Sequence, residues 1–88
     1  MVSRSVTVVN GLGLHARAAA RFVRIAGAFR SQIRVSRGTQ TTDGKSILGL
    51  LLLAAARGTR IQISAEGPDE EDAVRALTEL AERGFEDP

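Results

Sequence analysis

Apolar and polar residues alternate in several short stretches of the chain, a pattern typical of β-strands with one buried face. The stretch 2–9 is rich in valine, with Val6 and Val8 on one face and Thr7 on the other. In the stretch 61–65, isoleucine and alanine alternate with glutamine and serine. The pattern predicts strands over residues 2–9, 32–36, 39–42 and 61–65, with a hairpin turn at Arg37-Gly38 between the second and the third.

Three other stretches have the three- and four-residue spacing of helices with one apolar face. In residues 15–26 the small and apolar side chains form one stripe, and Arg17, Arg21 and Arg24 form the opposite one. A second helix is predicted over residues 46–57. A third helix is predicted to begin with Asp69 as its N-cap and to end at Gly84, with Phe85 packed beside Leu80.

The predicted elements follow one another in the order β-α-β-β-α-β-α. Alternating strands with one polar face favour an antiparallel sheet that is covered on one side. A chain of 88 residues is long enough for one two-layer core and too short for two. We therefore predict a single α+β domain spanning residues 1–88.

Composition excludes several classes of site. The chain has no cysteine and one histidine, so disulfides, a cysteine nucleophile, and thiolate or histidine metal sites are not expected. No cofactor is expected either. The N-terminus has no signal-peptide pattern, and the longest apolar run, residues 47–56, is far shorter than the roughly 20 residues that span a bilayer. We therefore expect a cytoplasmic protein with no membrane contact.

Charge is distributed unevenly along the chain. The net charge is only +2, but residues 1–42 contain seven arginines and no acid. Most of the acidic residues lie between Asp69 and Asp87. The electropositive half contains the single histidine, His15.

His15 lies where a predicted strand and loop give way to a predicted helix. A helix start exposes unpaired backbone N–H groups and the positive end of the helix dipole, so it suits an anion such as phosphate. The same positive field and a nearby arginine favour the neutral, nucleophilic imidazole. Arg17 is two residues further on, and its guanidinium can donate two hydrogen bonds to phosphate oxygens. On its own, a lone histidine here would more often be a cap or a surface residue.

Together these residues resemble the active-site signature of HPr, the histidine phosphocarrier of the phosphoenolpyruvate-dependent phosphotransferase system. The resemblance rests on Asn10, Gly13-Leu14-His15-Ala16-Arg17 and Ala18-Ala19. It extends over the whole chain, including the element order and the serine at Lys45-Ser46-Ile47. It implies an open-faced β-sandwich, a four-stranded antiparallel sheet covered on one face by three helices. It also implies that His15 accepts a phosphoryl group on Nδ1 from phospho-Enzyme I and passes it to an Enzyme IIA protein, with Arg17 stabilising the phosphate. Such a protein is a stoichiometric carrier and not an enzyme.

Two positions extend or modify this resemblance. The family generally has proline after the arginine, whereas this chain has Ala18. The substitution keeps the helix and adds a backbone N–H in its first turn, so we expect a modest change at the phosphate site. Ser46 is predicted to be a helix N-cap, and the resemblance also makes it the residue that HPr kinase/phosphorylase phosphorylates.

The second predicted helix is apolar on all sides, so a small domain cannot bury all of it. We expect Leu50, Leu53 and Ala54 to be buried. The residues expected in an exposed patch are Ile47, Leu48 and Leu51. In HPr-like proteins such a patch, flanked by Arg17, Arg21 and Arg24, binds Enzyme I and Enzyme IIA.

Several alternative functions compete with this one. A small basic nucleic-acid-binding domain is the main rival, but the chain has three phenylalanines and no other aromatic residue for base stacking. A regulatory protein acting only through Ser46 is the second. P-loop and dinucleotide motifs are incomplete, and a hydrolase is disfavoured because no acid lies near His15 in the sequence. We expect a monomer that binds no nucleic acid, and both the sugar and the nitrogen-related branches of the system stay open.

Overall fold

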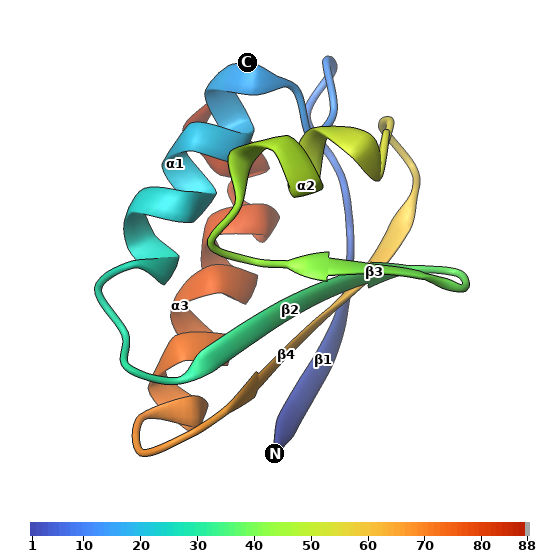
Figure 1. The fold of residues 1–88 in the computed structure, drawn as a ribbon. Coiled ribbons are helices and arrows are strands. Elements are labelled where there is room, and N and C mark those ends of the chain that lie inside the picture. Colours follow the sequence, from blue (N-terminus) through green and yellow to red (C-terminus); the bar gives the residue numbers. More distant parts are fainter. Residues whose placement is uncertain (88) are drawn as a thin grey trace.

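The computed structural model describes residues 1–87, in which four strands form one antiparallel sheet with helices on one face (Figure 1). The strands are β1 (Val2–Thr7), β2 (Gln32–Arg37), β3 (Gln40–Asp43) and β4 (Arg60–Glu66). The helices are α1 (Ala16–Ala26), α2 (Ile47–Leu52) and α3 (Glu70–Glu82), followed by the 3₁₀ turn η1 (Gly84–Glu86). The predicted element order and the α+β class are confirmed.

The register of the sheet separates an apolar face from a polar one. The strands lie in the order β1-β4-β2-β3. Val6 pairs with Ile61, and Val35 pairs with Ile63, so β-branched residues of three strands meet on the face beneath the helices. One residue along, Gln62 lies between Ser5 and Ser36 on the open face. The alternation read from the sequence is therefore the alternation of the two faces.

The helices close the core over the apolar face. The largest side chains that they and the C-terminal turn contribute to this core are Phe22 of α1, Leu50 of α2, Leu77 and Leu80 of α3, and Phe85 of η1, all nearly or fully buried. In the described part of the chain, no helix combines the length and apolar character that a membrane crossing requires.

Helix α2 is shorter than predicted. It ends at Leu52, whereas the apolar run predicted a helix to Arg57. Ala54 has a left-handed backbone with φ of 52° and is exposed, whereas Ala55 is buried in its place. The chain leaves the helix here because the Ala55 carbonyl accepts a hydrogen bond from the Leu14 N–H at 2.9 Å. The segment after α2 thus supports the loop that carries His15.

The ends of all four strands also differ from prediction. β2 continues to Arg37, so the hairpin turn lies at Gly38-Thr39, and β4 is one residue longer at each end. β1 stops at Thr7, and Val8 continues outside the ladder by exchanging backbone hydrogen bonds with Gly58 and Thr59 at 2.8 and 2.9 Å. β3 begins and ends one residue later than predicted. Val8 thus takes its hydrogen-bond partners from a loop, whereas β3 stays paired with β2 through Asp43.

Asp69 was predicted to cap α3, and it occupies the N-cap position, but its side chain makes no capping hydrogen bond. Its carboxylate instead accepts hydrogen bonds from the Arg30 N–H, the Ser31 N–H and the Ser31 hydroxyl at 2.6 to 3.0 Å. These bonds hold the pKa of Asp69 below its ordinary value, the Ser31 hydroxyl being the largest cause. Asp69 therefore ties the start of α3 to the loop before β2.

The chain end lies beside the start of α1 (Figure 1). Gly84 has φ of 65°, which ends α3 where predicted and turns the chain back. Arg21 of α1 donates from Nη1 to the Phe85 and Glu86 carbonyls at 3.1 and 2.8 Å. Residues 85 and 86 are thus held against α1.

Gly13 is a position where an added methyl group should be costly. Its φ is 66°, and a Cβ would lie 2.5 Å from the Ala55 carbonyl oxygen. Gly38 is a matched control because its φ is 59° and a Cβ there would meet nothing within 4 Å. We predict that Gly13→Ala lowers the free energy of unfolding by about 2 kcal/mol or more, and Gly38→Ala by about 1 kcal/mol, in urea denaturation. Equal losses would show that the contact with Ala55 is not tight.

Candidate functional site

The loop before α1 is built from short backbone contacts that fix the position of His15. The Gly13 N–H donates to the Asn10 carbonyl at 3.1 Å, and the buried Asn10 side chain donates from Nδ2 to the Gly13 carbonyl at 2.7 Å. Gly13 adopts a left-handed conformation that glycine accommodates without strain. The Leu14 N–H is bound to the Ala55 carbonyl. These contacts place His15 at the N-cap position of α1.

His15 is the N-cap of α1. Its backbone is extended, and its Nδ1 accepts a hydrogen bond from the Arg17 N–H at 3.3 Å. Capping by the imidazole itself places Nδ1 at the positive end of the helix, beside N–H groups that have no carbonyl one turn back. Nδ1 is thus the ring nitrogen nearest to a site suited to an anion.

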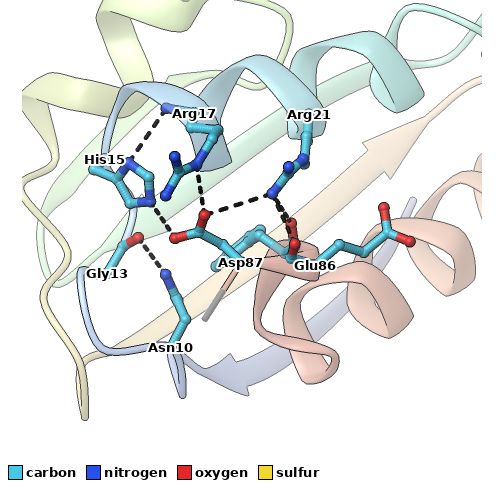
Figure 2. Close-up of polar contacts among 8 residues, drawn as sticks. Asn10, Gly13, His15, Arg17, Arg21, Glu86 and Asp87 are labelled. Carbon is cyan, nitrogen blue, oxygen red and sulfur yellow. Dashed lines mark hydrogen bonds and ion pairs between the residues drawn. The ribbon is translucent and has the colours of Figure 1, made fainter.

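The other ring nitrogen faces a carboxylate from the far end of the chain. His15 Nε2 lies 2.6 Å from Asp87 Oδ2, and Arg17 Nε donates to Asp87 Oδ1 at 2.6 Å (Figure 2). Arg21 Nη1 lies 3.6 Å from the same Oδ1. The Asp87 side chain is 1% exposed, whereas that of His15 is 24% exposed. One buried carboxylate therefore joins the histidine and two arginines.

This surrounding charge keeps Asp87 ionised. The hydrogen bond from Arg17 is the main reason why the pKa of Asp87 lies below its ordinary value. The contact with His15 acts in the same direction, whereas burial acts in the opposite one. Asp87 is therefore a carboxylate at neutral pH, and it can only accept hydrogen bonds.

The arrangement presents a nucleophile beside anion-binding groups. Arg17 binds Asp87 through Nε, and its side chain is 58% exposed, so its terminal nitrogens can reach a second anion. Among residues 1–87, no three His, Cys, Asp or Glu side chains gather in a way that could hold a metal ion. A neutral imidazole with this geometry can take up a group such as phosphoryl on Nδ1.

A protein-family model described as the PTS HPr component phosphorylation site matches residues 2–83. The chain belongs to the HPr family. Among its relatives, the phosphocarrier protein HPr of Neisseria meningitidis is 46% identical over 80 residues, which is 91% of this chain and 90% of the relative. HPr of Pseudomonas aeruginosa is 44% identical over 88 residues, or 99% of this chain and 98% of the relative.

Solved HPr structures have the same fold. The crystal structure of HPr-C-His from Thermoanaerobacter tengcongensis superposes with a TM-score of 0.95 at 41% sequence identity, covering 100% of this chain and 99% of that one. HPr from Bacillus anthracis gives a TM-score of 0.85 at 40% identity, covering 89% and 93%. The chain is therefore an HPr-type phosphocarrier and a component of the phosphotransferase system, whose members supply its partners.

The arginines predicted to surround the HPr site occupy different places. Arg17 and Arg21 both contact the C-terminal segment. Arg24 is exposed in the last turn of α1, at the far end of the helix from His15. Ala18, where HPr generally has proline, is buried in the first turn, and the helix begins at Ala16 regardless.

Ser46 is the N-cap of α2, as predicted. Its backbone is extended, and its hydroxyl accepts a hydrogen bond from the Gly49 N–H at 3.0 Å. Gly49 also packs closely against β3, because a Cβ there would collide with the Thr42 hydroxyl. The Ser46 hydroxyl therefore has a structural role, and the residue as a whole is partly exposed.

The apolar surface of α2 differs in part from the predicted patch. Ile47 and Leu48 are exposed as predicted, at 43% and 67%. Leu51 is half-buried and packs against the core, whereas Leu52 is 70% exposed. Leu50 and Leu53 are buried as predicted, whereas the prediction for Ala54 was wrong, because its left-handed backbone places it on the surface. Leu48 and Leu52 lie one turn apart on the same face of α2 and are both exposed, whereas Leu51 lies toward the core.

Asp87 is the site residue that sequence reasoning missed. It lies 72 residues from His15 along the chain, whereas the sequence showed only that no acid lies close to His15 along the chain. Two signals point toward it. The predicted turn at Gly84 reverses the chain, and the acids are concentrated at the C-terminus while the arginines are concentrated near His15.

Proposed function

We propose that this protein carries a phosphoryl group on His15, accepting it from phospho-Enzyme I and passing it to an Enzyme IIA protein. The observation that carries the proposal is the placement of Nδ1 of His15 at the start of α1, within a chain matched by an HPr phosphorylation-site model. The nucleophilic nitrogen therefore lies directly beside the anion-binding end of the helix.

In the transfer, the Nδ1 lone pair attacks the phosphorus atom of the donor phosphohistidine, and the donor P–N bond breaks as the new bond forms. The first-turn N–H groups and the terminal nitrogens of Arg17 hold the phosphoryl oxygens. The onward step is the same reaction in reverse, with a histidine of Enzyme IIA as acceptor. The protein is consumed and regenerated with each transfer, so it acts as a stoichiometric carrier.

We propose that side chains of α1, of α2 and of the loop before α1 form a docking surface for protein partners. Ile47 and Leu48 on α2 are exposed apolar residues, and Arg21 and Arg24 lie on α1. Leu51 contributes mainly to the core, and the exposed Leu52 and Leu12 enlarge the apolar surface. We propose that these residues contact Enzyme I and Enzyme IIA, with arginines steering acidic partners.

The phosphoryl acceptor can be tested with a variant that keeps the helix cap. Asparagine is among the best N-cap residues but has no nucleophilic nitrogen. We predict that the parent incorporates one acid-labile phosphoryl group in the presence of phosphoenolpyruvate and Enzyme I, whereas His15→Asn incorporates none. Arg17→Lys retains the charge but loses the planar guanidinium, and it should label more slowly.

Unfolding by urea checks that His15→Asn is folded. Label on the folded variant at the parent level would rule out His15 as acceptor, and an unlabelled parent would rule out the carrier function.

We further propose that Ser46 is phosphorylated by HPr kinase/phosphorylase. A phosphoserine oxygen at a helix N-terminus can still accept the Gly49 hydrogen bond, so the fold can tolerate it. The added negative charge would lie next to the exposed Ile47 and Leu48 and would act on docking partners.

Ser46→Ala separates the structural and regulatory roles of this residue. We predict that it lowers the free energy of unfolding by about 1 kcal/mol, because the α2 cap is lost. It should also abolish acid-stable labelling by ATP and the kinase, whereas Ser5→Ala, on the exposed edge strand β1, should leave labelling unchanged. Persisting label in the Ser46 variant would make Ser46 a cap alone.

A further inference from the structure

Both ring nitrogens of His15 have partners, and the two partners require the same neutral tautomer. The Asp87 carboxylate, 2.6 Å from Nε2, can only accept, so Nε2 carries the proton. The Arg17 N–H points at Nδ1 from 3.3 Å, so Nδ1 presents its lone pair. Figure 2 shows the ring held between these groups, with the carboxylate on the side away from Nδ1.

The tail that carries Asp87 is held in a strained conformation. Phe85 and Glu86 are consecutive non-glycine residues with φ of 57° and 58°, each costing about 1 kcal/mol or more. Arg21 binds both of their carbonyls, and Phe85 is fully buried. The strain is therefore offset by contacts that bring the next side chain, Asp87, onto His15 and Arg17.

From this geometry we propose that Asp87 is a positioning residue that holds the proton of His15 on Nε2 and so keeps Nδ1 free as the nucleophile. The proposal rests on the phosphoryl transfer proposed above and adds a residue to it. Asp87 touches neither the donor nor the phosphoryl group. It acts through the histidine ring, with one oxygen on His15 and the other on Arg17.

The proton on Nε2 matters in both directions of transfer. As Nδ1 attacks, the P–N bond forms, the donor nitrogen takes the electron pair of the broken bond, and the ring becomes positively charged while Nε2 keeps its proton. Asp87 then neutralises that ring. When the phosphoryl group is transferred to the acceptor, the electron pair of the P–N bond returns to Nδ1 and the His15 ring becomes a neutral imidazole again. No proton has to enter or leave the ring.

An amide in place of the Asp87 carboxylate should select the wrong tautomer. Arg17 can only donate, so in Asp87→Asn the amide oxygen would face Arg17 and the NH₂ group would face Nε2. Nε2 would then have to accept, which moves the ring proton to Nδ1, against the Arg17 N–H. In the serine-protease triad, the same exchange lowers turnover about 10⁴-fold because the tautomer is wrong. His15 is partly exposed, so a smaller effect is expected here.

The tautomer can be read directly by ¹⁵N NMR, because the chain has a single histidine. At a pH where the ring is neutral, we expect the parent to have a protonated Nε2 and an unprotonated Nδ1. Asp87→Asn should shift the population toward protonated Nδ1, and Asp87→Glu should restore much of the parent spectrum. Glu86→Gln is the matched control, since the Glu86 side chain points away from the ring (Figure 2). An unchanged tautomer in Asp87→Asn would overturn the proposal.

Kinetics supply the second measurement. In a single turnover with phospho-Enzyme I, or with phosphoramidate as a small donor, Asp87→Asn should accept the phosphoryl group about tenfold more slowly or worse. Asp87→Glu should recover most of the rate, and Glu86→Gln should match the parent. Parent rates in Asp87→Asn would contradict the proposal. Asp87→Ala, which removes the contact without adding an amide, is the fallback if the asparagine variant unfolds, and it too should react slowly.

The two measurements distinguish this proposal from the carrier function. The NMR spectrum needs no donor or partner, so it tests Asp87 even if Enzyme I transfers nothing to this protein. If the parent shows the expected tautomer but is not phosphorylated, the carrier function is ruled out, whereas the positioning of His15 by Asp87 is supported.

Discussion

The position of His15 depends on the close approach of two backbone segments. Gly13 lies against Ala55 with no room for a Cβ, and the Leu14 N–H donates to the Ala55 carbonyl. This contact ends α2 early and sets the loop before α1, so that His15 becomes the N-cap. The apolar core beneath explains why the sheet and helices assemble, but this loop contact explains why the histidine is at the helix end.

A second constraint is the set of ion pairs that joins the start of α1 to the C-terminal segment. Asp87, which follows the C-terminal turn, is buried and ionised between His15 and two arginines of α1, Arg17 and Arg21. The carboxylate offsets local positive charge, and Arg17 retains exposed terminal nitrogens for a second anion. The orientation of the His15 ring is thus fixed by contacts already in place, with Nδ1 directed at the start of α1.

Much of this architecture could be predicted from the sequence because it depends on local periodicity. Alternation in residues 32–36 and 61–65 identified β2 and β4, and the spacing in residues 15–26 identified α1. The end of α2 could not be predicted, since its apolar run continues past the last helical residue and the terminating contact comes from Leu14. Asp69 was misassigned for a similar reason, because Ser31 competes for its carboxylate from across the fold. Asp87 was missed because its histidine partner lies 72 residues away along the chain.

We propose that Nδ1 of His15, and not Nε2, is the reacting atom, because Nε2 is bound to Asp87 while Nδ1 faces the start of α1. The most direct measurement is combined ³¹P and ¹⁵N NMR on the uniformly ¹⁵N-labelled protein after phosphorylation by phosphoenolpyruvate and Enzyme I. We predict a single phosphohistidine with phosphorus bonded to Nδ1. Phosphorus on Nε2, or on any residue other than His15, would contradict it.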